Sequence, residues 1–104
     1  MKIMKVSNGL YRHYKGHIYM VDGVAKHTET LEDLVEYHAM YVDPEFGPYA
    51  HWVRPIGMFL ENVEVNGQRV PRFEKLSDQE SLAFLQGMLL KIAEENPEIL
   101  EKND

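Results

Sequence analysis

The chain has 104 residues, of which 44% are hydrophobic and 27% are charged, and this composition indicates one folded globular domain. It contains no cysteine, which excludes disulfides and thiolate metal sites. The net charge of −6 is uneven, because residues 1–76 carry nine Lys/Arg and ten Asp/Glu, whereas residues 77–104 carry two and seven. A nearly neutral body argues against a protein that holds nucleic acid through its phosphates.

The N-terminus MKIMKVSNGL contains two lysines but no apolar run of secretory length. No segment of the sequence approaches the roughly 20 apolar residues of a membrane span. We therefore expect a cytoplasmic protein with no membrane partner.

Residues 9–76 read as short strands separated by turn residues, which predicts a small sandwich or barrel. The turn signals are Gly16, Asp22-Gly23, Asp43-Pro44, Gly47-Pro48 and Asn66-Gly67. We expect one β domain over residues 1–76, followed by a helical extension over residues 77–104.

The segment YRHYKGHIYMV predicts a hairpin that turns at its glycine. Two registers are open, because a two-residue loop pairs His13 with Ile18, whereas a three-residue loop with the glycine in a left-handed conformation pairs His13 with Tyr19. We favour the second register, which also pairs Tyr11 with Val21. It gathers Tyr11, Tyr19 and Val21 on one buried face of the hairpin.

Residues 34–42, LVEYHAMYV, alternate in polarity and are rich in β-favouring side chains, so they predict a strand. Residues 49–54 predict another strand, which ends at Pro55. The following PIGMFL predicts a 3₁₀ turn that places Met58 and Phe59 in the core.

Asn66-Gly67 is the clearest local turn signal, because both residues tolerate the positive φ of a two-residue type I′ hairpin turn. This turn pairs Val63 with Val70. Pro71 cannot donate to a ladder, so the second strand of the hairpin should be an edge strand.

A helix should begin near residue 77, where Ser77 and Glu80 form a capping box. Asn96-Pro97 should end it. One helical face carries an apolar stripe made of Leu82, Leu85, Met88, Leu89 and Ile92. Such a stripe needs a cover, so we expect it to pack across the β domain or to meet a second copy in a homodimer.

Four segments in order, YRHYKG, IYMVDGVAKHTET, LVEYHAMY and WVRPIGMFLENVEVNGQRVPRFEKL, resemble the small bacterial family called domain of unknown function 1653. The resemblance covers about residues 9–76 and implies a five-stranded SH3-like barrel with no established activity. The chain departs from the family pattern in a longer DPEFGPYAH segment and in the helical extension. The recurring positions of the family map onto Tyr11, Arg12, His13, Lys15, Gly16, Tyr19, His27, Glu29, Tyr37, Trp52, Arg54, Pro55, Phe59, Arg72 and Phe73.

Histidine spacing offers weak support for a metal site. His13 and His17 are four residues apart, but that spacing has meaning on a helix and not in a hairpin. Convergence of His13, His27 and His51 across strands stays open, and we expect neither a metal nor a cofactor.

His27 and Glu29 suggest either an acid–base pair or a loop contact that fixes the histidine tautomer. No nucleophile–base set can be named, so we assign no catalytic residue and do not favour an enzyme.

Two kinds of binding protein fit the remaining pattern. Alternating aromatic and basic residues in YRHYKGHIY suggest a nucleic-acid-binding barrel, although the neutral body disfavours it. We favour a small binding module for a peptide or small anionic ligand, with aromatic anchors, arginines that orient a carboxylate, and a polar rim. The candidate site residues are Arg12, His13, His27, Glu29, Tyr37, Trp52 and Arg54. For His13, Trp52 and Arg54, purely structural roles stay open.

Overall fold

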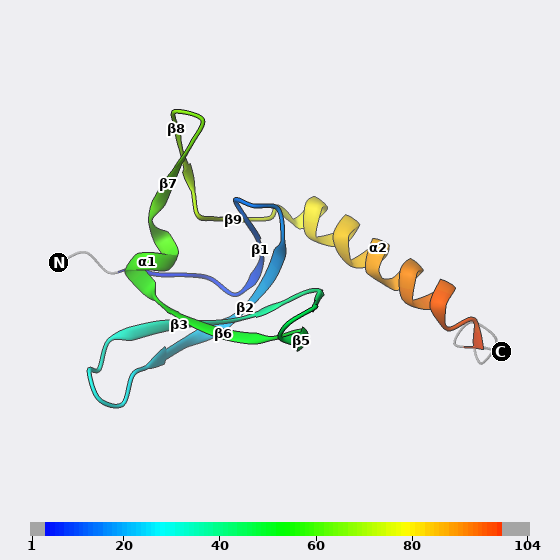
Figure 1. Cartoon of the computed structure of the whole chain (residues 1–104), viewed down its shortest axis with the longest axis horizontal. Coiled ribbons are helices and arrows are strands. Elements are labelled where there is room, and N and C mark those ends of the chain that lie inside the picture. Colours follow the sequence, from blue (N-terminus) through cyan, green and yellow to red (C-terminus); the bar gives the residue numbers. More distant parts are fainter. Residues whose placement is uncertain (1–3, 99–104) are drawn as a thin grey trace.

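The structure is a computed structural model, and it describes residues 4–98. Its centre is a five-stranded antiparallel sheet in the order β6-β3-β2-β1-β9 (Figure 1). The mainly β fold with a C-terminal helix therefore agrees with the sequence prediction. The five strands are β1 (Gly9–His13), β2 (Ile18–Lys26), β3 (Asp33–Ala39), β6 (His51–Pro55) and β9 (Phe73–Lys75).

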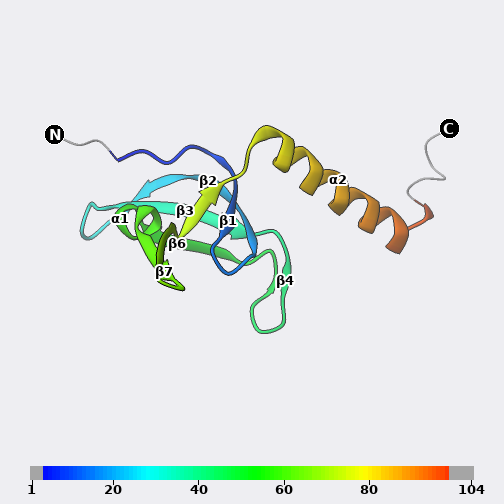
Figure 2. The same cartoon turned by 90° about the horizontal axis from the view of Figure 1, so that it is seen from above.

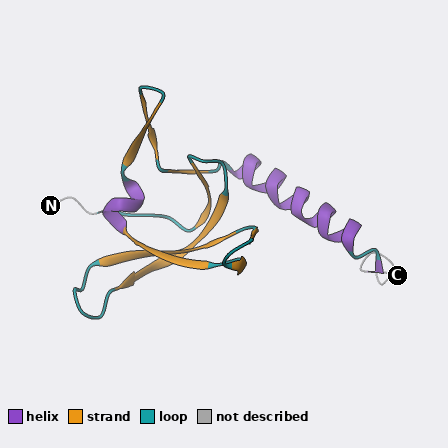
Figure 3. Ribbon diagram, in the orientation of Figure 1, coloured by secondary structure: helices purple, strands orange, loops and turns teal. Residues whose placement is uncertain are grey.

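Two small hairpins and two helices complete the described chain (Figure 3). The hairpins are formed by β4 (Val42–Asp43) with β5 (Gly47–Pro48), and by β7 (Asn62–Val65) with β8 (Gln68–Pro71). The helices are α1 (Ile56–Leu60) and α2 (Asp78–Glu95). No helix within residues 4–98 is long and apolar enough to cross a membrane.

The first hairpin has the predicted three-residue turn, with Gly16 at φ 110° and a hydrogen bond from the His13 N–H to the His17 carbonyl. The favoured register is wrong by two residues, because Tyr11 pairs with Tyr19, not with Val21. A shift of two leaves every side chain on its original face. Tyr11 and Val21 are therefore buried together, and Tyr19 packs against the same cluster, as the sequence predicted.

The core lies between this sheet and α1. Phe59 of α1 is 1% exposed and packs with Val35 and Tyr37, which are on the inward face of β3. The alternation of LVEYHAMYV is confirmed, although β3 ends at Ala39. The prediction for Met58 is wrong, because its side chain is 47% exposed, and Ile56 is buried in its place. PIGMFL forms a short α-helix rather than a 3₁₀ turn, so residues 56 and 59 share its inner face.

The hairpin at Asn66-Gly67 matches its prediction. Val63 pairs with Val70, and the two turn residues have φ values of 50° and 79°. Within the described chain, β8 has β7 as its one strand neighbour, so Pro71 lies on an edge strand as expected.

Helix α2 has the predicted capping box, with the Ser77 side chain accepting from the Glu80 N–H and the Glu80 side chain accepting from the Ser77 N–H. It extends away from the sheet in both views (Figures 1 and 2), and none of its residues is buried. Leu82 and Leu89 are 59% and 66% exposed. Of the two covers expected for the apolar stripe, burial against the β domain is therefore not observed within residues 4–98.

Candidate functional site

The inward face of the sheet contains a hollow of about 210 Å³, which we call the aromatic pocket. All five strands of the sheet contribute to it, because each strand places one or two alternate residues on this face. The pocket is lined by His13, Tyr19, Tyr37, Trp52, Arg54 and Phe73. It lies directly beside the core, since Tyr37 and Phe73 belong to both.

Arg54 is held at the wall of the aromatic pocket by two neighbours. Its Nε donates a hydrogen bond to the Tyr37 hydroxyl at 3.3 Å. Its guanidinium carbon lies 5.7 Å from the centre of the Phe73 ring, which is within the range of a cation–π contact. Because Arg54 is on β6 and Phe73 on β9, this contact joins side chains from the two edge strands of the sheet.

Arg54 differs from Arg12 and Arg72 in having no carboxylate partner among residues 4–98. Arg12 forms an ion pair with Glu80 at 3.4 Å, and Arg72 forms one with Glu61 at 2.6 Å. Within residues 4–98, no carboxylate lies at ion-pair distance from Arg54. The aromatic pocket therefore presents a positive charge that the described protein does not neutralise.

His13 packs edge-on against Phe73, with 4.9 Å between ring centres, and its Nδ1 accepts the Lys15 backbone N–H at 3.2 Å. Burial lowers the pKa of the His13 imidazole, and the nearby charge of Arg54 lowers it further. Three further neighbours act in the same direction: Lys15, Arg72 and His17. His13 is therefore neutral at pH 7, and its Nε2–H is a hydrogen-bond donor.

Tyr19 adds a second neutral group to the pocket. Its hydroxyl is hydrogen-bonded to the Tyr41 hydroxyl at 2.7 Å. Burial, followed by this hydrogen bond, raises the pKa of Tyr19 far above its usual value. The phenol therefore stays protonated, and the pocket gains no negative charge from it.

The structure brings together four of the seven residues selected from the sequence, namely His13, Tyr37, Trp52 and Arg54. Arg12 faces a different hollow of about 340 Å³, which the carboxylate-bearing Glu74 also lines. The sequence did not single out Tyr19 and Phe73 as pocket residues. The alternation of inward and outward residues along their strands indicated that both side chains are buried. It did not indicate that they would line a pocket at the edge of the core.

His27 and Glu29 lie away from the aromatic pocket. They are in the β2–β3 loop, at the far end of a nine-residue strand that spans about 30 Å (Figure 1). His27 Nδ1 accepts the backbone N–H groups of Glu29 and Thr30 at 3.0 and 3.3 Å. This is the loop contact that the sequence analysis gave as one of two alternatives. His27 makes it with backbone N–H groups and not with the Glu29 carboxylate.

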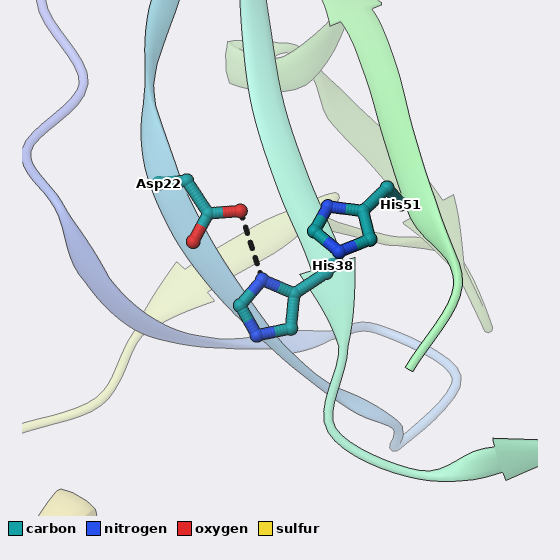
Figure 4. Close-up of side chains that lie close together, drawn as sticks. All are labelled: Asp22, His38 and His51. Carbon is teal, nitrogen blue, oxygen red and sulfur yellow. Dashed lines mark hydrogen bonds and ion pairs between the residues drawn. The ribbon is translucent and has the colours of Figure 1, made fainter. Parts of the chain in front are cut away.

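A further group of polar side chains lies on the outward face of the sheet (Figure 4). It consists of Asp22, His38 and His51, and it was not predicted. The convergence of His13, His27 and His51 is not observed, because His51 lies opposite His38 in the β3–β6 pairing. The strand pairing and a bulge in β2 bring these residues together, so no local sequence signal could have identified them.

The similarities of the chain to known proteins agree with its fold. The model of a family described as proteins of unknown function, DUF1653, matches residues 9–75. The chain is also similar to the crystal structure of a DUF1653 protein from Bordetella bronchiseptica, with 30% sequence identity and a TM-score of 0.64 over 72% of this chain and 94% of that chain. No curated protein matches it. The match covers well over half of the sequence and confirms the resemblance noted above, so the chain belongs to the DUF1653 family, whose function is unknown.

Proposed function

We propose that this protein is a small, non-enzymatic binding module that receives a small anionic group in the aromatic pocket. The group would be the carboxylate of a peptide or of a small molecule. The observation that carries the proposal is the guanidinium of Arg54, which lies in an aromatic hollow with no carboxylate partner among the described residues. A cytoplasmic location is part of the same proposal.

The chemistry of the pocket favours a carboxylate. The planar fork of a guanidinium matches the two oxygens of a carboxylate, and such charge-assisted hydrogen bonds are stronger than neutral ones. Tyr37 occupies Arg54 Nε, which leaves the terminal nitrogens of the fork for a ligand. The neutral imidazole of His13 offers a further donor on the same wall.

The size of the pocket limits the ligand. Pockets for drug-sized ligands usually measure about 300–1,000 Å³, and this one measures about 210 Å³. A single side chain or chain terminus is therefore a better fit than a complete nucleotide cofactor. Trp52, half-exposed at the edge of the pocket, would pack against an apolar part of such a ligand.

We also propose that the sheet forms the five-stranded SH3-like barrel implied by the sequence resemblance. In support, the edge strands β6 and β9 approach each other through Arg54 and Phe73, and Tyr37 of β3 contacts the same Phe73 ring at 5.4 Å between centres. In a barrel whose two edges meet, the inward face would be enclosed, and residues from all five strands would line one pocket, as they do here.

Trp52 makes the proposal directly testable, because it is the one tryptophan of the chain and it lines the pocket. Its fluorescence can be titrated with acetate, inorganic phosphate and N-acetyl-phenylalanine, and with the uncharged amide of N-acetyl-phenylalanine for comparison. We expect a saturable change with N-acetyl-phenylalanine and none with its amide. The absence of a response to all three anions (N-acetyl-phenylalanine, acetate and inorganic phosphate) would contradict the proposal.

Substitution of the arginine separates a specific site from general charge attraction. Arg54→Gln should abolish the response to N-acetyl-phenylalanine, because it removes the positive fork while keeping a polar side chain. Arg69→Gln, in the β7–β8 hairpin outside the pocket, removes the same charge and should leave the response unchanged. Equal losses in both variants would show that net charge, and not the pocket, attracts the ligand.

Nucleic-acid binding is the alternative, because an arginine beside tyrosine and tryptophan rings can also stack a base. The nearly neutral charge of residues 1–76 makes us expect no appreciable binding to single- or double-stranded nucleic acid at physiological salt. Fluorescence anisotropy with labelled oligonucleotides tests this expectation. Binding in the micromolar range with a steep salt dependence would reverse the preference.

A further inference from the structure

The outward face of the sheet carries a cluster of three potential metal ligands, and it is the one such group within residues 4–98. We propose that Asp22, His38 and His51 form a binding site for a divalent first-row transition-metal ion such as Zn²⁺. The proposed ligands lie on the other face of the sheet from the aromatic pocket, because the side chain of His38 lies on the other face of β3 from its neighbour Tyr37.

The backbone of three adjacent strands places the ligands. His38 of β3 and His51 of β6 are directly opposite each other in the ladder, with ring centres 5.1 Å apart. Cross-strand neighbours of this kind point their side chains from the same face of a sheet. Two imidazoles thus lie side by side without any need for a flexible loop.

Asp22 reaches the two histidines because of a β-bulge in β2. The β2–β3 pairing joins Val21 to Tyr37 and then Gly23 to Glu36, so that Asp22 is the extra, unpaired residue. A bulge bends its strand and re-aims the side chain of the additional residue. The carboxylate of Asp22 points toward His38 (Figure 4), and its Oδ2 lies 2.8 Å from His38 Nδ1.

The distances permit a shared metal ion after small movements. One ligand atom from each residue lies within 4.8 Å of the other two. Around a tetrahedral ion with bonds of about 2.0–2.1 Å, ligand atoms are about 3.3 Å apart. The widest gap must therefore close by at most about 1.5 Å, which rotation of the exposed His51 side chain can supply.

The short contact between Asp22 and His38 also fits this role. It places two of the three ligand residues at hydrogen-bond distance from each other. A carboxylate beside imidazoles lowers the cost of bringing a dication to the surface, and Glu36 adds a second carboxylate to the hollow of about 260 Å³ that Asp22 and His51 line.

The donor set identifies the class of metal. Two imidazole nitrogens and one carboxylate oxygen suit Zn²⁺, Ni²⁺, Co²⁺ or Cu²⁺. Ca²⁺ and Mg²⁺ prefer oxygen ligands throughout, so they fit poorly. Three protein ligands leave at least one position open to water or to a donor from a partner molecule.

Isothermal titration calorimetry of the tag-free full chain with ZnCl₂, after treatment with a chelator, tests the proposal. We expect saturable binding of one Zn²⁺ per chain. His51→Ala and Asp22→Asn should each weaken binding by at least about tenfold, which is the effect of losing even an indirect partner of a metal site. His17→Ala removes an exposed histidine outside the cluster and should bind Zn²⁺ as the wild type does.

Two controls keep the result interpretable. Circular dichroism should show the same unfolding midpoint for the metal-free variants as for the wild type, since His51 and Asp22 are exposed. If one variant has lost its fold, the other variant supplies the binding comparison. With Co²⁺, paramagnetic broadening of amide signals should be centred on residues 22, 38 and 51. Absence of saturable binding, broadening centred elsewhere, or equal affinity in His51→Ala and His17→Ala would overturn the proposal.

Discussion

The rings of Phe59 and Phe73 are stacked nearly parallel, with 4.2 Å between their centres and an angle of 7° between their planes. Phe59 belongs to α1, and Phe73 belongs to β9, an edge strand of the five-stranded sheet. The same Phe73 ring lines the aromatic pocket and lies below Arg54. Core packing therefore determines the shape of the proposed binding site.

Phe59→Ala should reduce the free energy of unfolding by about 3–5 kcal/mol, because it removes a fully buried ring and leaves a cavity. Met58→Ala, one residue earlier, should cost less than about 1 kcal/mol, since the Met58 side chain is 47% exposed. Urea unfolding curves measure both changes. Similar losses in the two variants would show that α1 is rotated relative to the arrangement described above.

The stability of the protein should fall as the pH is lowered below neutrality, in part because of His13. Its pKa in the folded state is below the usual 6.5, mainly through burial and then through Arg54. The unfolded chain therefore binds a proton more readily than the folded protein does. The contribution of neutral His13 to stability is complete above pH 6.5 and is lost as the pH falls toward the lower pKa of the folded state.

His13→Gln should reduce this loss, because glutamine does not titrate. The measurement is the free energy of unfolding of wild type and variant at pH values from about 7.5 to 5.5, on either side of the ordinary histidine pKa. The other four histidines are present in both proteins, so the difference between the two curves reports His13. Parallel curves would contradict the lowered pKa.

Gly67→Ala should destabilise the β7–β8 hairpin by about 1–2 kcal/mol. Gly67 has a φ of 79°, a region in which an L-residue with a Cβ is strained. The space around it is open, so the expected cost is conformational and not a clash. Urea unfolding combined with hydrogen exchange of the hairpin amides measures the loss.

Gly87→Ala provides the matched control, because the same chemical change should there have the opposite sign. Gly87 lies in the middle of α2, with nothing within 4 Å of an added Cβ. Alanine should stabilise the helix by about 0.5–1 kcal/mol, which circular dichroism at the helical minimum detects. A stabilising effect of Gly67→Ala would exclude the type I′ turn.

We expect the chain to form a homodimer through α2. The helix extends from the sheet (Figure 1). The leucines of its apolar stripe are exposed, and exposed patches of this kind usually mark an interaction surface. An identical stripe on a second copy is self-complementary in a two-fold dimer. Sedimentation velocity over a range of protein concentrations measures the association.

A paired substitution tests whether the stripe is the interface. The double variant Leu82→Gln with Leu89→Gln should shift the protein toward the monomer. Leu31→Gln changes an equally exposed leucine in the β2–β3 loop and should leave the association unchanged. A wild type that stays monomeric at all concentrations would contradict the dimer.

Features that depend on residues close together in the chain were determined by the sequence itself. The type I′ turn needs only Asn66-Gly67 with strands on either side, and the cap of α2 needs only Ser77 and Glu80. The alternation of β3 is likewise a property of consecutive residues, so its buried face could be assigned before its partners were known.

The tertiary structure alone decided what depends on contacts between distant segments. The alternation of side chains along each strand assigned Tyr11 and Tyr19 to one face of the sheet. It could not distinguish pairing registers that differ by two residues. The aromatic pocket needs five strands to converge, and it excludes His27 and Glu29 because they lie beyond the far end of β2. The Asp22–His38–His51 cluster needs both the β3–β6 register and a bulge, and no run of neighbouring residues encodes either of these.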